Sequence, residues 1–211
     1  MSRPFLWFVK ISGLPVQHFY FKKKIYTENG DKSLRKIKGG ALIVSNHTSI
    51  YDYPLIMYAF LPRTLHTLVA EVIYQKNAML AWLVKHLGCI RVDRADYDFA
   101  FMSEMVSYLR KGHVGLVFPE SRLPQEGETD LLPFKPSYVM MALEADVPII
   151  PVYTNGVYGK SKKEKKTTAK LMSGKPIYLS DLIDREKSEK ENIEFINDYV
   201  KNRIRELAFS Q

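Results

Sequence analysis

The fold is organised around residues 41–52, which read Ala41-Leu42-Ile43-Val44-Ser45-Asn46-His47-Thr48-Ser49-Ile50-Tyr51-Asp52. The apolar run at the start predicts a buried strand, and the polar residues after it predict a turn. Ligands of open α/β sheets bind at the carboxyl ends of the strands, so we expect Asn46 and His47 to lie at a binding edge. Asp52 then opens an apolar stretch and suits the first turn of a helix, where carboxylates are favoured.

The spacing of His47 and Asp52 limits how their side chains can meet. Five residues put them about 140° apart on one helix and on opposite faces of one strand. They meet only if the chain turns between them, and Asn46, Thr48 and Ser49 are residues that form such turns. A carboxylate that holds one imidazole nitrogen leaves the other as a base toward a hydroxyl. The alternative is that His47 is a structural or surface histidine.

Length and composition indicate a globular chain of ordinary make-up. The 211 residues suffice for one substantial α/β domain with its own core. A single cysteine, Cys89, excludes an internal disulfide and favours a reducing compartment. No HExxH, paired-cysteine or acidic metal-loop spacing occurs, so we expect no metal and no bound cofactor.

The chain is basic, with a formal net charge of +8 and a pI of about 9.4. Such a charge attracts nucleic acids, acidic carrier proteins and anionic membranes alike. The lysines cluster in loops without interleaved aromatic residues, which is not typical of a nucleic-acid-binding module. We expect no nucleic acid as partner but keep that class as the alternative. The lysine-rich stretch 159–170 is either a solvated loop or a docking site for an acidic partner.

The N-terminal segment is aromatic and then basic. Residues 4–21 are too short and too interrupted to span a membrane, and they do not form a typical signal peptide. Their aromatic residues, followed by Lys22-Lys23-Lys24, predict a segment lying in an anionic membrane interface. The alternative is a helix packed on the core of the domain. We expect an interfacial segment and connector over residues 1–38, a domain over residues 39–211, and a peripheral position on the cytoplasmic face of the membrane.

Strands and helices alternate after residue 40. Strands are predicted at 41–44, 65–70, 89–92, 114–118 and 147–153, with an edge strand within 170–179. Helices are predicted at 53–61, 75–87, 97–111, 136–144 and 189–209. This order favours a single α/β domain with a mostly parallel or mixed sheet flanked by helices. Residues 22–40 are expected to form a connector.

Further polar residues follow three of these elements. Arg94 comes just after a strand, Glu120 and Arg122 follow a buried run, and Lys135 stands at the entrance of a helix. Arginine binds phosphate oxygens with two parallel hydrogen bonds, and a helix N-terminus adds an anion site. Each residue alone is typical of a surface ion pair, but their order after His47 and Asp52 indicates one site.

These blocks resemble the motifs of the glycerolipid and lysophospholipid acyltransferases over about residues 35–180. The Asn-His-x4-Asp motif of that family is present as Asn46-His47 through Asp52, and Gly88 through Arg94 fits Gly-x-x-x-(Ile/Val)-x-Arg. The third and fourth motifs are represented by Phe118-Pro119-Glu120-Ser121-Arg122 and Val147-Pro148-Ile149-Ile150-Pro151-Val152.

Three positions depart from the family pattern. Ser121 replaces a glycine, and one residue separates Glu120 from Arg122 where the commonest form has two. Ser137 stands where a glycine often follows the helix-entry lysine, and Arg91 stands where an apolar residue is usual.

The resemblance implies acyl transfer from acyl-CoA or acyl carrier protein to the free hydroxyl of lysophosphatidate. His47 would act as general base and Asp52 would orient its ring. Arg94 and Arg122 would hold the acceptor's phosphate, with Lys135 as a further candidate and Glu120 aligning Arg122 or the glycerol hydroxyl. Another lysophospholipid or glycerol 3-phosphate stays open as acceptor. A covalent hydrolase is disfavoured because no Gly-x-Ser-x-Gly motif occurs, and a family member without catalysis is a further alternative.

Overall fold

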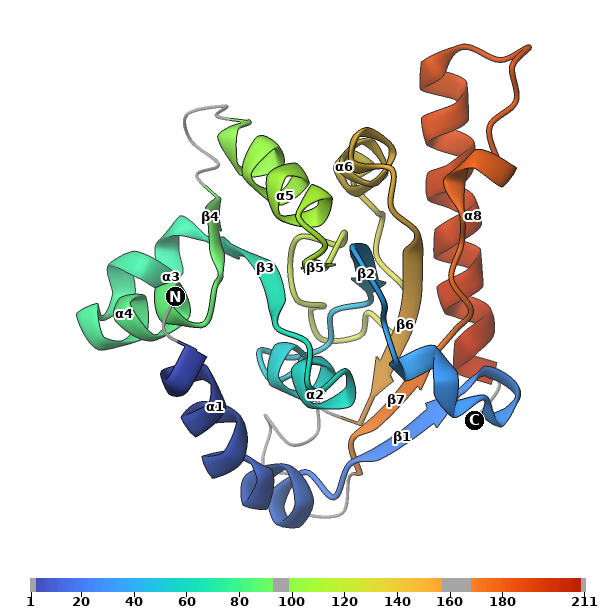
Figure 1. Ribbon diagram of the computed structural model, residues 1–211. Helices are drawn as coiled ribbons and strands as arrows, with labels where there is room; N and C mark the ends of the chain where they lie inside the picture. The colour runs from blue at the N-terminus through green and yellow to red at the C-terminus, as the bar shows by residue number, and fades with distance from the viewer. Residues whose placement is uncertain (1–2, 93–98, 157–167, 210–211) are drawn as a thin grey trace.

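The computed structural model describes residues 3–92, 99–156 and 168–209, and it contains a seven-stranded sheet (Figure 1). The strand order is β1-β7-β6-β2-β5-β3-β4. The strands are β1 (Lys24–Thr27), β2 (Ala41–Ser45), β3 (Leu65–Ala70), β4 (Ile90–Val92), β5 (Val114–Val117), β6 (Ile149–Asn155) and β7 (Lys170–Ser173). β6, β2, β5, β3 and β4 run parallel, whereas β7 is antiparallel to β6 and β1 is parallel to β7. The sheet is therefore mixed, as the sequence predicts.

Helices cover both faces of the sheet. They are α1 (Arg3–Ser12), α2 (Asp52–Ala59), α3 (Glu71–Lys76), α4 (Ala78–His86), α5 (Ala100–Arg110), α6 (Ser137–Ala145) and α8 (Glu189–Phe209). Figure 1 shows α5, α6 and α8 on one side of the sheet and α2 on the other. One half of the core joins α5, α6 and α8 to the sheet, and the other half joins α2 to it.

β2 lies at the centre and is fully covered on both faces. Leu42 and Val44 pack in the core half of α5, α6 and α8, while Ala41 and Ile43 pack in the half of α2. This division follows the twofold period of a strand, which sends successive side chains to opposite faces. A strand buried on both faces is expected to be continuously apolar, and that is the run at Ala41–Val44. β2 therefore holds the residues that follow it in a rigid position.

Most predicted elements are present with boundaries within three residues of those expected. β3 and α8 match their predicted ranges fully, and the buried stripe of α8 consists of Ile196, Val200, Ile204 and Leu207. The predicted helix at 75–87 is instead two helices, because Asn77 has an extended backbone. The Asn77 side chain accepts a hydrogen bond of 2.8 Å from the Met79 N–H and so starts α4.

Two predictions about the end of the sheet formed by β1 and β7 are wrong. Residues 22–40 are not only a connector, because they contribute β1, which pairs with β7 in register from Lys24–Lys170 to Thr27–Ser173. The sheet therefore begins ahead of residue 39. β7 in turn is an interior strand between β1 and β6 and not an edge strand. β1 escaped prediction because its four residues are mostly polar and it follows a run of lysines.

The N-terminal helix α1 is fastened to the domain by a buried lysine. Lys10 is 4% exposed, and its Nζ donates to the carbonyl oxygens of Pro62 (3.0 Å) and Arg63 (3.2 Å). The Tyr58 hydroxyl donates to the Val9 carbonyl at 2.9 Å. The segment also leaves large apolar side chains exposed, namely Trp7, Phe8, Ile11, Leu14, Val16, Phe19 and Tyr20. Within the described ranges, no helix is both long and apolar enough to cross a membrane.

Candidate active site

The turn after β2 brings His47 and Asp52 together. β2 ends at Ser45 and α2 begins at Asp52, so the chain reverses within six residues. His47 Nδ1 lies 3.1 Å from Asp52 Oδ2. The His47 side chain is 21% exposed, whereas that of Asp52 is fully buried. The contact that the spacing predicts is therefore present, with the imidazole at the surface of the carboxyl edge.

Asp52 is held by a ring of donors. Its Oδ2 accepts the backbone N–H of Thr48 at 2.6 Å and that of Ser49 at 2.8 Å. The Thr154 hydroxyl, from the end of β6, lies 3.2 Å from Oδ1. A buried carboxylate is stable when it accepts several hydrogen bonds and lies at a helix N-terminus, and Asp52 meets both conditions. Its orientation toward His47 is thereby fixed.

Asn46 connects the turn to β6. Its Nδ2 donates to the Thr154 carbonyl at 2.9 Å, and its Oδ1 accepts the Thr154 N–H at 2.7 Å. The amide thus extends the parallel pairing of β2 with β6 beyond Ser45 and Val152. Only a side chain with both a donor and an acceptor satisfies the two backbone groups. Asn46 is therefore a structural member of the site that anchors the start of the turn.

Glu120 contacts the backbone of the turn that carries His47. Its Oε1 accepts the His47 N–H at 3.0 Å, and its Oε2 accepts the Leu132 N–H at 3.3 Å. Burial raises the pKa of the Glu120 carboxyl above its usual value, although these two hydrogen bonds act in the opposite direction. Phe118, two residues earlier, stacks on the imidazole of His47 with ring centroids 4.3 Å apart and planes 22° from parallel. The Phe118–Glu120 segment therefore fixes His47 from a second side.

Arg122 pairs with Glu128 in its own loop. Nη1 lies 2.6 Å from Glu128 Oε2 and Nη2 lies 2.7 Å from Oε1, so the contact is bidentate. Between Glu120 and Arg122, Ser121 has φ of +60°, a left-handed conformation that favours glycine. The glycine of the family pattern thus has a conformational basis, and Ser121 adopts the same backbone at a cost.

Of the other residues singled out in the sequence, the structure describes Lys135 and Arg91. Lys135 is exposed, and its backbone N–H donates to the Pro119 carbonyl at 3.0 Å, so it lies beside the Glu120 turn. Arg94 and residues 159–167 of the lysine-rich stretch lie outside the described residues. Arg91, which is unusual for the family pattern, forms an ion pair with Glu71 of α3.

The sequence patterns did not predict that Thr154 belongs to the site. Thr154 follows an apolar run at the carboxyl end of β6, and that position was the available signal. The N–H groups of His47, Thr48 and Ser49 donate to the carboxylates of Glu120 and Asp52. No group of three or more His, Cys, Asp or Glu side chains suited to a metal ion occurs in the described part of the chain.

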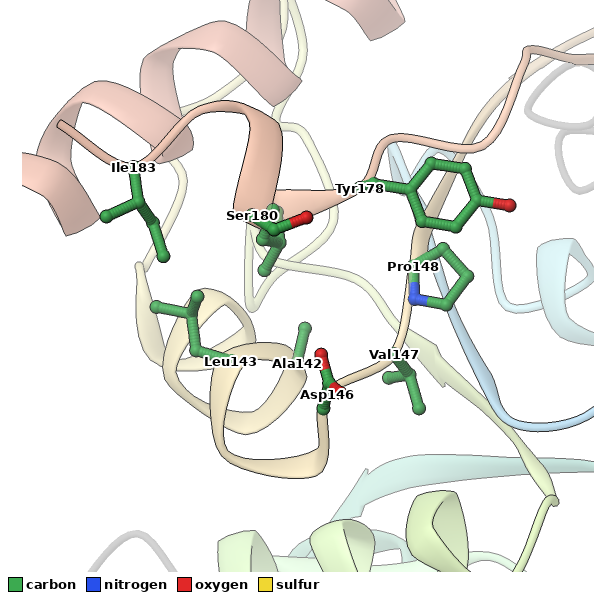
Figure 2. Close-up of a pocket in the computed structure, with 9 residues that line it drawn as sticks. Ala142, Leu143, Asp146, Val147, Pro148, Tyr178, Ser180 and Ile183 are labelled. Atoms are coloured by element: carbon green, nitrogen blue, oxygen red, sulfur yellow. The ribbon is translucent and has the colours of Figure 1, made fainter.

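A separate pocket lies at the opposite end of β6. Figure 2 shows it between α6 and residues 178–183, with Asp146, Pro148 and Tyr178 among its lining residues. Pro148 precedes Thr154 by six residues, which corresponds to roughly 20 Å along a strand. The pocket is therefore distant from His47 and is not part of the candidate site.

Comparison with known proteins agrees with this architecture. A solved structure of the 1-acyl-sn-glycerophosphate acyltransferase PlsC from Thermotoga maritima superposes with a TM-score of 0.69 at 23% sequence identity. The superposition covers 96% of this chain and 79% of that one. At this identity the likeness establishes the fold, which is the α/β fold with a mixed sheet described above.

Sequence relatives point in the same direction. A 1-acyl-sn-glycerol-3-phosphate acyltransferase of Limnanthes douglasii is 33% identical over 125 residues, which are 57% of this chain and 43% of the relative. The Haemophilus influenzae enzyme of the same name is 27% identical over 175 residues, or 79% of this chain and 69% of the relative. The chain thus spans less than half the length of the plant relative. The profile of the Acyltransferase family matches residues 20–155, which is more than half of the chain. The chain therefore belongs to the acyltransferase family.

Proposed function

We propose that the protein transfers a fatty acyl group from an acyl thioester to the free hydroxyl of lysophosphatidate, giving phosphatidate. The observation that carries this proposal is the contact of His47 Nδ1 with the buried Asp52 carboxylate. Within the described residues, Nε2 of His47 has no hydrogen-bond partner, and the side chain is partly exposed. The names of the relatives, which specify 1-acyl-sn-glycerol-3-phosphate as the molecule acted on, support the choice of acceptor.

The proposed reaction depends on which nitrogen of the His47 imidazole carries the proton. An ionised Asp52 accepts the Nδ1–H of His47, so the lone pair lies on Nε2. Nε2 removes the proton of the acceptor hydroxyl while its oxygen attacks the thioester carbonyl, a general-base step typically worth about 10²–10⁴-fold. Asp52 stabilises the imidazolium that forms. When the C–S bond breaks, the imidazolium returns the proton to the leaving thiolate, and the ester and thiol are released.

The turn residues serve this step by holding His47 still. Phe118 stacks on the ring and Glu120 holds the His47 backbone, so ring rotation and turn movement are both limited. Positioning of this kind contributes to rate because reacting atoms must approach to about 3–3.5 Å. Glu120 thus acts as a positioning residue for His47.

The acceptor's phosphate is proposed to bind at the loops after β4 and β5. Arg122 follows Glu120 by two residues, and Lys135 is hydrogen-bonded through its backbone to the Pro119 carbonyl, so both cations flank the turn that carries His47. In the sequence, Arg94 follows the last residue of β4 by two positions. Cationic side chains at this edge suit a phosphate monoester.

Association with an anionic membrane surface is proposed for the N-terminal segment. Phe8 and Phe19 are 68% and 74% exposed, and Lys22, Lys23 and Lys24 follow at once. Exposed aromatic residues next to lysines favour the interface of a membrane with anionic lipids. The buried Lys10 fastens this segment to the catalytic domain, which would place the site beside its lipid substrate. We further propose that this surface is the cytoplasmic face.

The test is thiol release from acyl-CoA and from acyl carrier protein, each with and without lysophosphatidate. Release that requires lysophosphatidate, with phosphatidate as product, is the expected result and identifies the donor. Release without any acceptor would contradict the proposal and indicate a thioesterase. Parallel reactions with glycerol 3-phosphate and with other lysophospholipids decide between the acceptors. Retention on heparin without acyl transfer would favour a nucleic-acid-binding protein.

A further inference from the structure

The guanidinium of Arg122 is engaged by a carboxylate. Both of its terminal nitrogens bind the two oxygens of Glu128, at 2.6 and 2.7 Å. The two side chains are 46% and 33% exposed, so the pair lies at the surface where a ligand can reach it. A parallel pair of N–H···O contacts is the arrangement in which an arginine binds a phosphate.

Glu128 is held in place by the loop that carries it. Its Oε2 also accepts the Gln125 N–H at 2.6 Å, and Gly127, with φ of +90°, allows the tight turn between them. The hydrogen bonds from Arg122 lower the pKa of the Glu128 carboxyl to about 2. Glu128 is therefore ionised at any physiological pH, and the pair exists before a ligand arrives.

The loop lies next to the turn that carries His47. Arg122 follows Glu120 by two residues, and Glu120 accepts the His47 N–H. A phosphate that bound the Nη1–Nη2 edge of Arg122 with two hydrogen bonds would need the two positions that Glu128 occupies. Carboxylate and phosphate therefore cannot hold this face of the guanidinium together.

We infer that Glu128 is an internal competitor for the anionic headgroup of the acceptor and a specificity-determining residue of this site. The inference rests on the proposed function. An acceptor anion forms two parallel hydrogen bonds with the Nη1–Nη2 edge of Arg122 only by displacing Glu128, which lowers the apparent affinity for that anion. A phosphate monoester, which carries up to two charges, displaces the carboxylate more readily than a phosphodiester with one.

The experiment measures binding separately from catalysis. Glycerol 3-phosphate is titrated by calorimetry into the full chain as wild type, Glu128→Gln and Glu126→Gln, and the Michaelis constant for lysophosphatidate is measured alongside. Glu126 is an exposed residue of the same loop, so its substitution removes the same charge without touching the pair. Exposed ion pairs contribute little, so we expect Glu128→Gln to tighten glycerol 3-phosphate binding by about two- to fivefold. Glu126→Gln should leave it within about 1.5-fold.

A double-mutant comparison completes the test. With Arg122→Ala in the background, Glu128→Gln should have no effect, because the contested nitrogens are gone. Glu128→Asp, which keeps the charge but shortens the side chain, serves if Glu128→Gln folds poorly and should give an intermediate affinity. Equal or weaker binding in Glu128→Gln would overturn the inference, and weaker binding would mean that Glu128 positions Arg122. Absence of acyl transfer with every acceptor would instead reject the proposed function. The affinity for glycerol 3-phosphate would still test whether Glu128 competes for Arg122.

Discussion

His47 Nδ1 lies 3.1 Å from Asp52 Oδ2, and the same oxygen accepts the backbone N–H groups of Thr48 and Ser49. The two residues belong to different elements, since one follows β2 and the other begins α2. The turn between them is closed by the carboxylate itself. Asp52 therefore has two roles, because it orients the imidazole and it shapes the turn that carries it.

Replacing Asp52 by asparagine tests both roles. An asparagine amide has one oxygen and one NH2 group. With the NH2 at the Oδ2 position it faces the N–H groups of Thr48 and Ser49 and the Nδ1 of His47. With the NH2 at the Oδ1 position it faces the Thr154 hydroxyl, and in both orientations the charge that stabilises the imidazolium is lost. We expect Asp52→Asn to lower turnover by at least about 10²-fold and to lower the free energy of unfolding by about 1–3 kcal/mol. Acyl-transfer kinetics and chemical denaturation measure the two effects. Thr154→Val, which removes one neutral hydroxyl from Asp52, should cost about tenfold or less in turnover. Equal losses in the two variants would contradict the account.

Glu120 should produce a pH-dependent contribution to stability. Burial raises its pKa above the usual 4.5, so the folded protein binds the Glu120 proton more tightly than the unfolded chain does. The contribution of a group with a raised pKa is fully present below the unfolded value and is lost as pH rises through the folded value. We therefore expect the free energy of unfolding of wild type, relative to Glu120→Gln, to decrease as pH rises upward from about 4.5. Chemical denaturation of both proteins between about pH 4 and pH 7 measures this difference in the free energy of unfolding. If wild type instead became more stable relative to Glu120→Gln as pH rises, the pKa of Glu120 would be lowered by folding and not raised.

Ser121 has the left-handed backbone that glycine adopts without cost. A non-glycine residue in this region destabilises the folded protein by about 1–2 kcal/mol. A glycine removes this strain, but part of the resulting stabilisation is offset because glycine is more flexible in the unfolded chain. Ser121→Gly is expected to raise the free energy of unfolding by about 0.5–1 kcal/mol. Ser121→Ala, which keeps the strain and removes the hydroxyl, should be no more stable than wild type. If Ser121→Ala were more stable than Ser121→Gly, relief of backbone strain at Ser121 would not explain the stabilisation.

The exposed aromatic residues of the N-terminal segment should govern membrane binding. Phe8→Ser combined with Phe19→Ser removes two large apolar side chains from the proposed interface, each worth about 1.5–3 kcal/mol when fully buried. We expect at least about a tenfold loss of binding to vesicles containing anionic lipid. Flotation of the vesicles measures the bound fraction. Phe195→Ser on α8, which removes an exposed phenylalanine far along the chain, should bind as wild type. Undiminished binding of the double variant would place the membrane contact elsewhere.

The sequence predicted the elements that show a clear hydrophobic period and the turn that motif spacing requires. Long apolar patterns matched β3 and α8 over their full ranges, and the spacing of His47 and Asp52 required the turn that is found. β1 was missed because a short, mostly polar strand acquires its stability from pairing with β7, a contact distant in sequence. The break at Asn77 was missed because a local hydrogen bond overrides an otherwise helical pattern.

Side-chain partners were less predictable than elements. Thr154 lies 102 residues from Asp52, and only the folded sheet brings them together. Glu120 is expected to align Arg122 or the glycerol hydroxyl, and its buried oxygens also accept the His47 and Leu132 N–H groups, which the sequence did not predict. Arg122 is expected to hold the acceptor's phosphate, and the structure adds a partner that the spacing did not predict, the Glu128 carboxylate six residues ahead. Each difference arises where several partners compete for one side chain, and spacing alone does not decide that competition.

The role of His47 as general base is tested by comparing His47→Ala with His113→Ala in acceptor-dependent thiol release. His113 precedes β5 at the opposite edge of the sheet, so its substitution removes an imidazole without touching the site. We expect His47→Ala to keep its melting temperature within a few degrees of wild type and to lose at least about 10²-fold in turnover. His113→Ala should retain turnover within about threefold of wild type. Turnover of folded His47→Ala equal to that of wild type would contradict the assignment of His47 as the general base.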